Sequence, residues 1–85
     1  MKKVINRKMY NTDTAKEIYS TRTMNSTRWQ VLYKKKTGEF FVEHVTCWQG
    51  EEDSIEPISE ERAKDWAEKY MDGDEYEELF GEVEE

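Results

Sequence analysis

His44 and Cys47 are the residues whose chemical types and spacing come nearest to those of a catalytic pair. They lie three positions apart in a segment that is typical of a β-strand. Side chains alternate between the two faces of a strand, so an odd separation places this pair on opposite faces, where it cannot share a proton. We interpret Cys47 as a small apolar residue and His44 as an ordinary strand residue, and we expect no catalytic residues.

The acidic segment Asp72-Gly73-Asp74-Glu75 has the composition of a calcium-binding loop. An EF-hand loop needs an oxygen ligand at position 5 and a glycine at position 6. Counted from Asp72, these positions hold Tyr76 and Glu77, so the pattern fails and the segment is interpreted as a break between helices. The sequence also contains no glycine-rich phosphate loop and no serine-nucleophile elbow. We expect no metal, no cofactor and no enzymatic activity.

Three consecutive lysines, Lys34, Lys35 and Lys36, fall at the expected tip of a β-hairpin. Aromatic residues flank them on both arms of the hairpin: Tyr33, Phe40 and Phe41. Positive charge beside aromatic rings can bind single-stranded nucleic acid. However, the net charge of the chain is -7, which repels phosphates, and lysines at strand ends also protect a sheet from edge-to-edge pairing. A nucleic-acid-binding module at this tip is kept as an alternative.

A row of carboxylates on the predicted helix 60–72 is the other candidate site. At 100° per residue, four acids project within a narrow sector opposite Trp66: Glu61, Asp65, Glu68 and Asp72. Successive members are about 4.5–6 Å apart along the axis. The next segment adds Asp74, Glu75, Glu77 and Glu78. Two interpretations remain open: a solvated helix face, or a surface that occupies a basic groove built for a nucleic-acid backbone.

The charge of the chain is divided unevenly along its length. Residues 1–50 hold ten basic and four acidic residues, a net charge of +6, and residues 51–85 hold three basic and sixteen acidic residues, a net charge of -13. Such asymmetry indicates either that the two parts neutralise each other within the fold or that the acidic part is displayed to a basic partner.

The composition predicts one small domain spanning residues 1–85. The chain is 35% hydrophobic and 39% charged, and its 13% of aromatic residues favours a folded chain with a thin core. No apolar run approaches the length of about 20 residues that a membrane span needs. The single cysteine excludes an internal disulfide and fits a reducing compartment. We expect a cytoplasmic protein.

The residue pattern predicts an α+β fold, with a three- or four-stranded antiparallel sheet, an amphipathic helix packed on one face and short additional helices. The expected elements are a hairpin over residues 2–10, a short helix over 13–19, a second hairpin with arms at 29–34 and 39–48, an edge strand over 54–57, and helices over 60–72 and 75–80. The expected core lies between sheet and helix: Val31, Tyr33, Phe40 or Phe41, Val42, Trp66, Ala67, Tyr70 and Met71.

The helix over 60–72 has the clearest boundaries. Ser59 is a good N-cap, and Ile58 before it is placed to contact Ala63 as a hydrophobic staple. Gly73 is expected to end this helix in a left-handed conformation. Gly81 is expected to end the following helix, with fraying of residues 82–85.

Three stretches of the sequence, residues 1–18, 32–41 and 58–81, resemble small acidic proteins carried by phages and mobile elements of Gram-positive bacteria. Members of that group commonly have glycine after the turn asparagine, where this chain has Arg7. Some small acidic phage proteins of this kind are anti-CRISPR inhibitors. The resemblance implies a protein of the host-cell cytoplasm whose partner is a basic host protein or nucleoprotein complex, in particular a CRISPR-Cas effector. An interaction subunit of another phage or host assembly is the remaining alternative.

Overall fold

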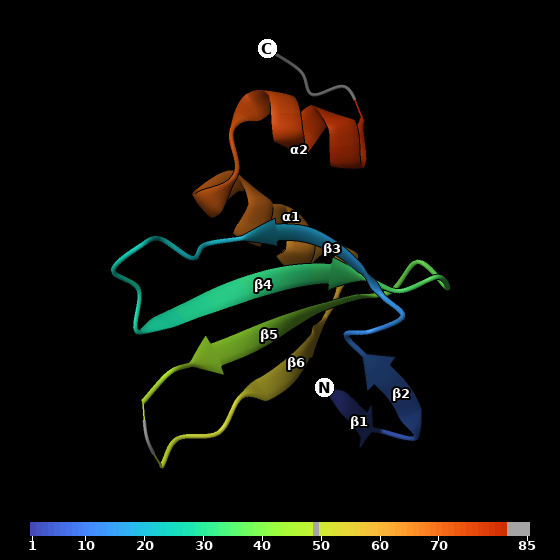
Figure 1. Cartoon of the computed structure of the whole chain (residues 1–85). Coiled ribbons are helices and arrows are strands. Elements are labelled where there is room, and N and C mark those ends of the chain that lie inside the picture. The colour runs from blue at the N-terminus through green and yellow to red at the C-terminus, as the bar shows by residue number, and fades with distance from the viewer. Residues whose placement is uncertain (49, 82–85) are drawn as a thin grey trace.

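The computed structural model describes residues 1–48 and 50–81 and has an α+β fold (Figure 1). A two-stranded and a four-stranded antiparallel sheet are followed by two helices. The elements in chain order are β1 (Lys2–Ile5), β2 (Lys8–Asn11), β3 (Lys16–Ser20), β4 (Arg28–Lys34), β5 (Phe40–Thr46), β6 (Ser54–Ile58), α1 (Glu60–Tyr70) and α2 (Gly73–Phe80). The prediction of an antiparallel sheet with helices is confirmed. The expected fraying of residues 82–85 lies outside the described residues.

The four-stranded sheet is a meander in the order β3-β4-β5-β6, with every neighbouring pair antiparallel. Strands β4 and β5 are rich in the β-branched and aromatic residues that favour extended backbone. The turn between them is closed by the Gly38 amide, which donates to the Lys35 carbonyl at 2.9 Å. Gly38 has a φ of 94°, which glycine adopts without steric cost, as expected for this hairpin.

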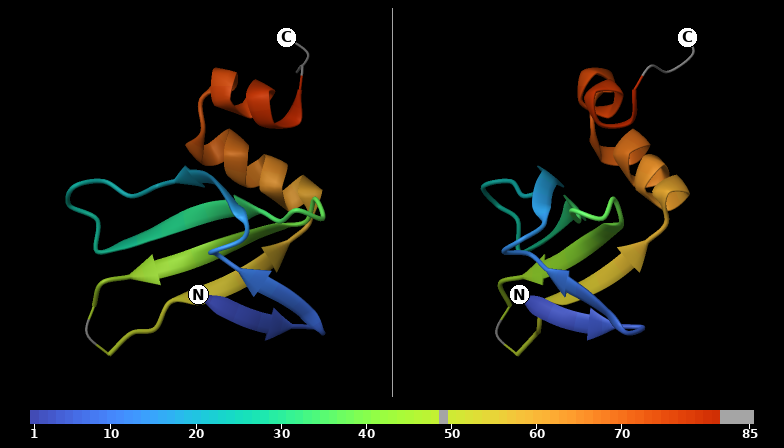
Figure 2. Two further views of the ribbon diagram at one scale, coloured as in Figure 1. Left: turned by 45° about the vertical axis from the view of Figure 1, so that its right-hand side comes forward. Right: turned by 90° about the vertical axis from the view of Figure 1, so that its right-hand side faces the viewer.

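The central sheet has a hydrophobic core on each face, because the runs in β4 and β5 are apolar at consecutive positions. On one face, Leu32, Phe40 and Val42 pack with Ala63 of α1. The opposite face packs against the β1–β2 hairpin through a second cluster: Tyr10, Val31, Tyr33, Phe41 and Ile55. The fold therefore has three layers, with the hairpin on one side and the helices on the other (Figure 2).

Two residues of the expected helix-side core lie on the other face. Val31 and Tyr33 are buried, but against the N-terminal hairpin rather than against α1. Of the two phenylalanines, Phe40 faces the helices and Phe41 the hairpin. The prediction assumed one buried face, whereas the sheet buries both, so alternate residues of each strand contribute to different cores. Three of the four helical residues are confirmed, because Ala67 is fully buried and Trp66 and Met71 pack against the helix-side cluster. Tyr70 is half-buried and contacts the Trp66 ring outside that cluster.

The prediction of a short helix over residues 13–19 is wrong, because most of this segment belongs to strand β3 (Lys16–Ser20). The polar residues that suggested a helix cap instead form a turn around Asn11, whose side-chain oxygen accepts from the Asp13 amide at 2.9 Å. The following residues pair with β4, with a register shift between Glu17 and Tyr19. This bulge places the side chains of Ile18 and Tyr19 on the same face of the sheet, so both contact the helix layer.

The hairpin predicted over residues 2–10 is confirmed, with β1 and β2 joined by Asn6 and Arg7. Both turn residues have positive φ, 51° and 66° respectively. This geometry is the tight hairpin turn that asparagine and glycine favour. Arginine has a Cβ atom and adopts the conformation at a steric cost.

The two helices begin at well-formed caps. Ser59 accepts a hydrogen bond from the Arg62 amide at 3.2 Å, and Ile58 joins the same apolar cluster as Ala63. Helix α1 ends at Tyr70, earlier than expected, because Asp72 caps α2. Gly73 is therefore the first residue of α2 rather than a left-handed helix end. Gly81 ends α2 as predicted, with a φ of 91°. Neither helix is long and apolar enough to cross a membrane in the part of the chain described.

Candidate protein-interaction surface

The carboxylates predicted on α1 point away from the core. Glu61, Asp65 and Glu68 are exposed, whereas Ala63 and Ala67, on the opposite side of the helix, are fully buried. The amphipathic pattern produces this arrangement, because the small alanines let α1 approach the sheet closely and leave the acidic positions outward. The prediction that these three side chains share an exposed helix face is confirmed.

Asp72 has a structural role at the junction of the helices. Its side chain accepts from the Glu75 amide at 2.9 Å, and the Glu75 side chain accepts from the Asp72 amide at 3.3 Å. This reciprocal pair is a capping box, which satisfies two backbone donors at the start of α2. These two carboxylates are therefore held in fixed positions at the start of α2.

Helix α2 extends the acidic surface beyond α1. Asp74, Glu77 and Glu78 are exposed, and Glu75 is half-buried. The helices lie together at one end of the molecule, while the basic β1–β2 hairpin lies at the other (Figure 1). We call the eight residues of α1, α2 and their junction the acidic helix surface: Glu61, Asp65, Glu68, Asp72, Asp74, Glu75, Glu77 and Glu78.

Within residues 1–48 and 50–81, the ion pairs involve other carboxylates, although one of them includes Arg62 of α1. They join Lys8 and Lys35 to Glu39, Arg28 to Glu51, and His44 and Arg62 to Glu56. None of them includes a member of the acidic helix surface. Like charges at i,i+4, such as Glu61 and Asp65, destabilise a helix by a few tenths of a kcal/mol, roughly 0.2–0.5 kcal/mol per pair. Lys64 and Lys69 of α1 lie beside the acidic row and offset part of this repulsion, but within the described residues no basic side chain forms an ion pair with the eight carboxylates.

The three lysines of the hairpin tip do not form a common surface. The Lys34 ammonium lies 5.5 Å from the centre of the Phe40 ring on the helix side. The Lys35 ammonium lies 4.3 Å from the Tyr10 ring on the hairpin side and 3.8 Å from Glu39. Lys36 is exposed at the turn. The neighbouring strand aromatics are buried in the two cores and offer no open ring face for a base: Tyr33, Phe40 and Phe41.

The structure places His44 and Cys47, the other candidates for chemistry, in separate contacts with neighbouring strands and loops. The His44 Nε2 atom lies 3.1 Å from a carboxylate oxygen of Glu56, and the Cys47 thiol donates to the Thr27 carbonyl at 3.4 Å. These contacts hold the two residues to different partners. No group of three or more histidine, cysteine, aspartate or glutamate side chains suited to a metal ion occurs among the described residues.

The strongest electrostatic perturbation lies on the hairpin side of the sheet and was not anticipated from the sequence. Burial, together with the negative charge of Glu43, raises the pKa of Tyr33 to about 12. Burial and the neighbouring carboxylate of Asp53 raise the pKa of Glu43. The Tyr33 hydroxyl donates to Glu43 at 3.4 Å. This is a cross-strand contact inside the fold, and it is remote from the acidic helix surface.

No protein-family model, curated protein or solved structure matches the chain.

Proposed function

We propose that this protein is a non-enzymatic binding protein whose acidic helix surface occupies a basic nucleic-acid groove on a host nucleoprotein complex. The observation that carries the proposal is the exposed negative charge on α1 and α2, which the described residues leave without ion pairs. Charge complementarity between such a surface and a basic groove accelerates association and fixes orientation. The partner loses its nucleic acid by competition.

A CRISPR-Cas effector is the specific partner that we propose. Such complexes hold nucleic acid in positively charged channels and first engage a short duplex beside the target. An acidic surface on a small domain fits competition for that duplex or for the target strand. The resemblance of residues 1–18, 32–41 and 58–81 to small acidic phage proteins supports this choice.

The test is a competition assay. A fluorescent target duplex is bound to RNA-guided effectors from Gram-positive bacteria, and its release is followed by fluorescence anisotropy as the protein is added. We expect release by the wild-type protein from at least one effector. A variant with Glu61→Gln and Glu68→Gln should be at least fivefold weaker, because both charges come from the exposed face of α1. Asp72 is left intact because it caps α2.

The matched control removes two exposed carboxylates that belong to neither helix, Asp13→Asn and Glu52→Gln. It should release the duplex as well as wild type does. Equal weakening of both variants would show that net charge, rather than a positioned surface, causes the competition. Full activity of the α1 variant would contradict the proposal. Tight, salt-sensitive binding of the protein to free DNA or RNA would instead favour the nucleic-acid-binding alternative.

A further inference from the structure

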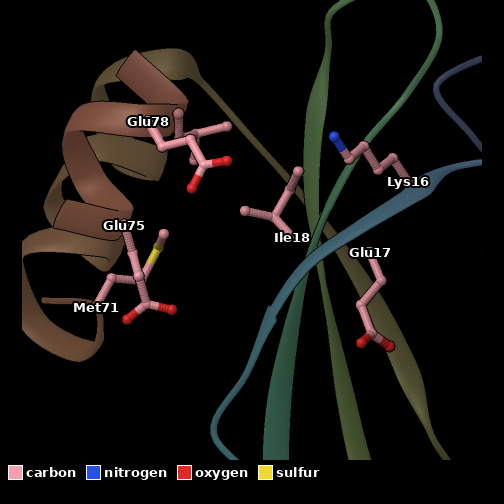
Figure 3. A pocket seen from close by; sticks show the side chains of 7 residues that line it. Lys16, Glu17, Ile18, Met71, Glu75 and Glu78 are labelled. Atoms are coloured by element: carbon pink, nitrogen blue, oxygen red, sulfur yellow. The ribbon is translucent and has the colours of Figure 1, made fainter. Parts of the chain in front are cut away.

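A small cleft separates α2 from the free edge of β3 (Figure 3). Its volume is about 210 Å³. Small-molecule sites usually have volumes of about 300–1,000 Å³. The cleft is therefore of a size for one side chain rather than for a metabolite. The sequence interpretation missed it because residues 13–19 were expected to be helical.

One part of the cleft is apolar. Ile18 points from β3 toward the helical segment, and Met71 and Leu79 line the cleft from that segment (Figure 3). The bulge in β3 turns Ile18 to this side, where all three residues also pack at the edge of the helix-side core. They provide a surface for the aliphatic part of a side chain.

The charged lining of the cleft is predominantly negative. Glu75 and Glu78 contribute carboxylates from α2, and Lys16 contributes one ammonium group from β3. Glu17 of β3 also lines the cleft, but its side chain points away from α2 (Figure 3). Only one oxygen of Glu75 is used by the Asp72 amide, and Glu78 is exposed. Within the described residues, no ion pair joins Lys16 to either carboxylate. A cation entering the cleft would meet two carboxylates with oxygens free to accept.

We propose that this cleft receives one arginine side chain of the basic protein partner. The aliphatic stem lies against Ile18, Met71 and Leu79, and the guanidinium group binds the carboxylates of Glu75 and Glu78. Arginine fits better than lysine because its planar group donates to two carboxylate oxygens at once and is more weakly hydrated. The proposal rests on the proposed function in one respect, namely that the partner is a basic protein.

The direct test is an NMR titration with N-acetyl-arginine methylamide and with its uncharged citrulline analogue. The arginine derivative should shift the methyl signals of Ile18, Met71 and Leu79 and saturate in the millimolar range. The citrulline analogue should bind at least fivefold more weakly. Absence of saturable shifts at these methyl groups, or equal binding of both derivatives, would overturn the proposal.

Matched variants locate the binding group. Glu78→Gln should weaken binding of the arginine derivative at least threefold, whereas Glu77→Gln removes the same charge from the same helix outside the cleft and should change it less than 1.5-fold. Lys16→Met removes the competing cation and should tighten binding. Equal effects of the two glutamate variants would overturn the assignment. The titration needs no effector, so its failure is distinct from failure of the duplex-competition assay.

Discussion

Replacing Trp66 by alanine should destabilise the protein by about 3 kcal/mol, at the low end of the range for removing a tryptophan from a core. The indole contacts two aromatic rings, Tyr19 at 6.1 Å and Tyr70 at 4.8 Å between ring centres. Such pairs contribute roughly 0.5–1.5 kcal/mol each beyond their burial. The indole N–H also donates to Gln30 at 2.9 Å. The side chain is only half-buried, which limits the cost of losing its apolar contacts.

The assay is urea unfolding followed by far-UV circular dichroism, which does not depend on tryptophan fluorescence. A loss of about 3 kcal/mol corresponds to a Tm decrease of about 12–24 °C in a domain of this size. Trp48→Ala is the matched control, since Trp48 is 53% exposed and its removal should cost less than about 1 kcal/mol. A loss below 1 kcal/mol for Trp66→Ala, or equal losses for both variants, would refute the assigned helix-side core.

Three further predictions concern particular backbone and titration features. Arg7→Gly should stabilise the protein by about 0.5–1 kcal/mol, measured by urea unfolding, because Arg7 has a φ of 66° and glycine removes its steric cost. Asp72→Ala should cost about 1 kcal/mol and speed amide hydrogen exchange at the start of α2, because it removes the N-cap acceptor. The pKa of Tyr33 is raised to about 12, so above pH 10 the unfolded chain loses this proton before the folded chain does, and stability should fall from pH 10 to 12. Tyr33→Phe should reduce that slope in unfolding measured across this pH range; an unchanged slope would contradict the assignment.

The elements that the sequence predicted well are those specified by local residue patterns. The hairpin of β4 and β5 follows from two strongly β-favouring segments around Gly38. Helix α1 follows from the Ser59 cap and an apolar stripe at helical spacing. The exposed positions of Glu61, Asp65 and Glu68 follow from the same spacing and are confirmed. Their partner remains a prediction.

The features that the sequence did not reveal depend on tertiary contacts. Residues 13–19 have local helix signals, but pairing with β4 and the turn at Asn11 determine their structure. The assignment of Val31 and Tyr33 to a core required knowing that the N-terminal hairpin covers the second face of the sheet. A continuous apolar run is compatible with either face, so periodicity alone could not decide between them. The cleft beside Ile18 depends on the first of these features, because β3 and the helical segment line it.

The distribution of acids on α2 gives a physical reason to look for their role outside the fold. Asp72 and Glu75 cap the helix, and Asp74 lies in its first turn, where negative charge interacts favourably with the helix dipole. Glu77 and Glu78 lie in the second half, where the dipole favours basic residues, and the last turn has none. Both are exposed, and neither belongs to an ion pair in the part of the chain described. They therefore oppose helix formation in the isolated domain, and a basic partner would turn the same two charges into favourable contacts.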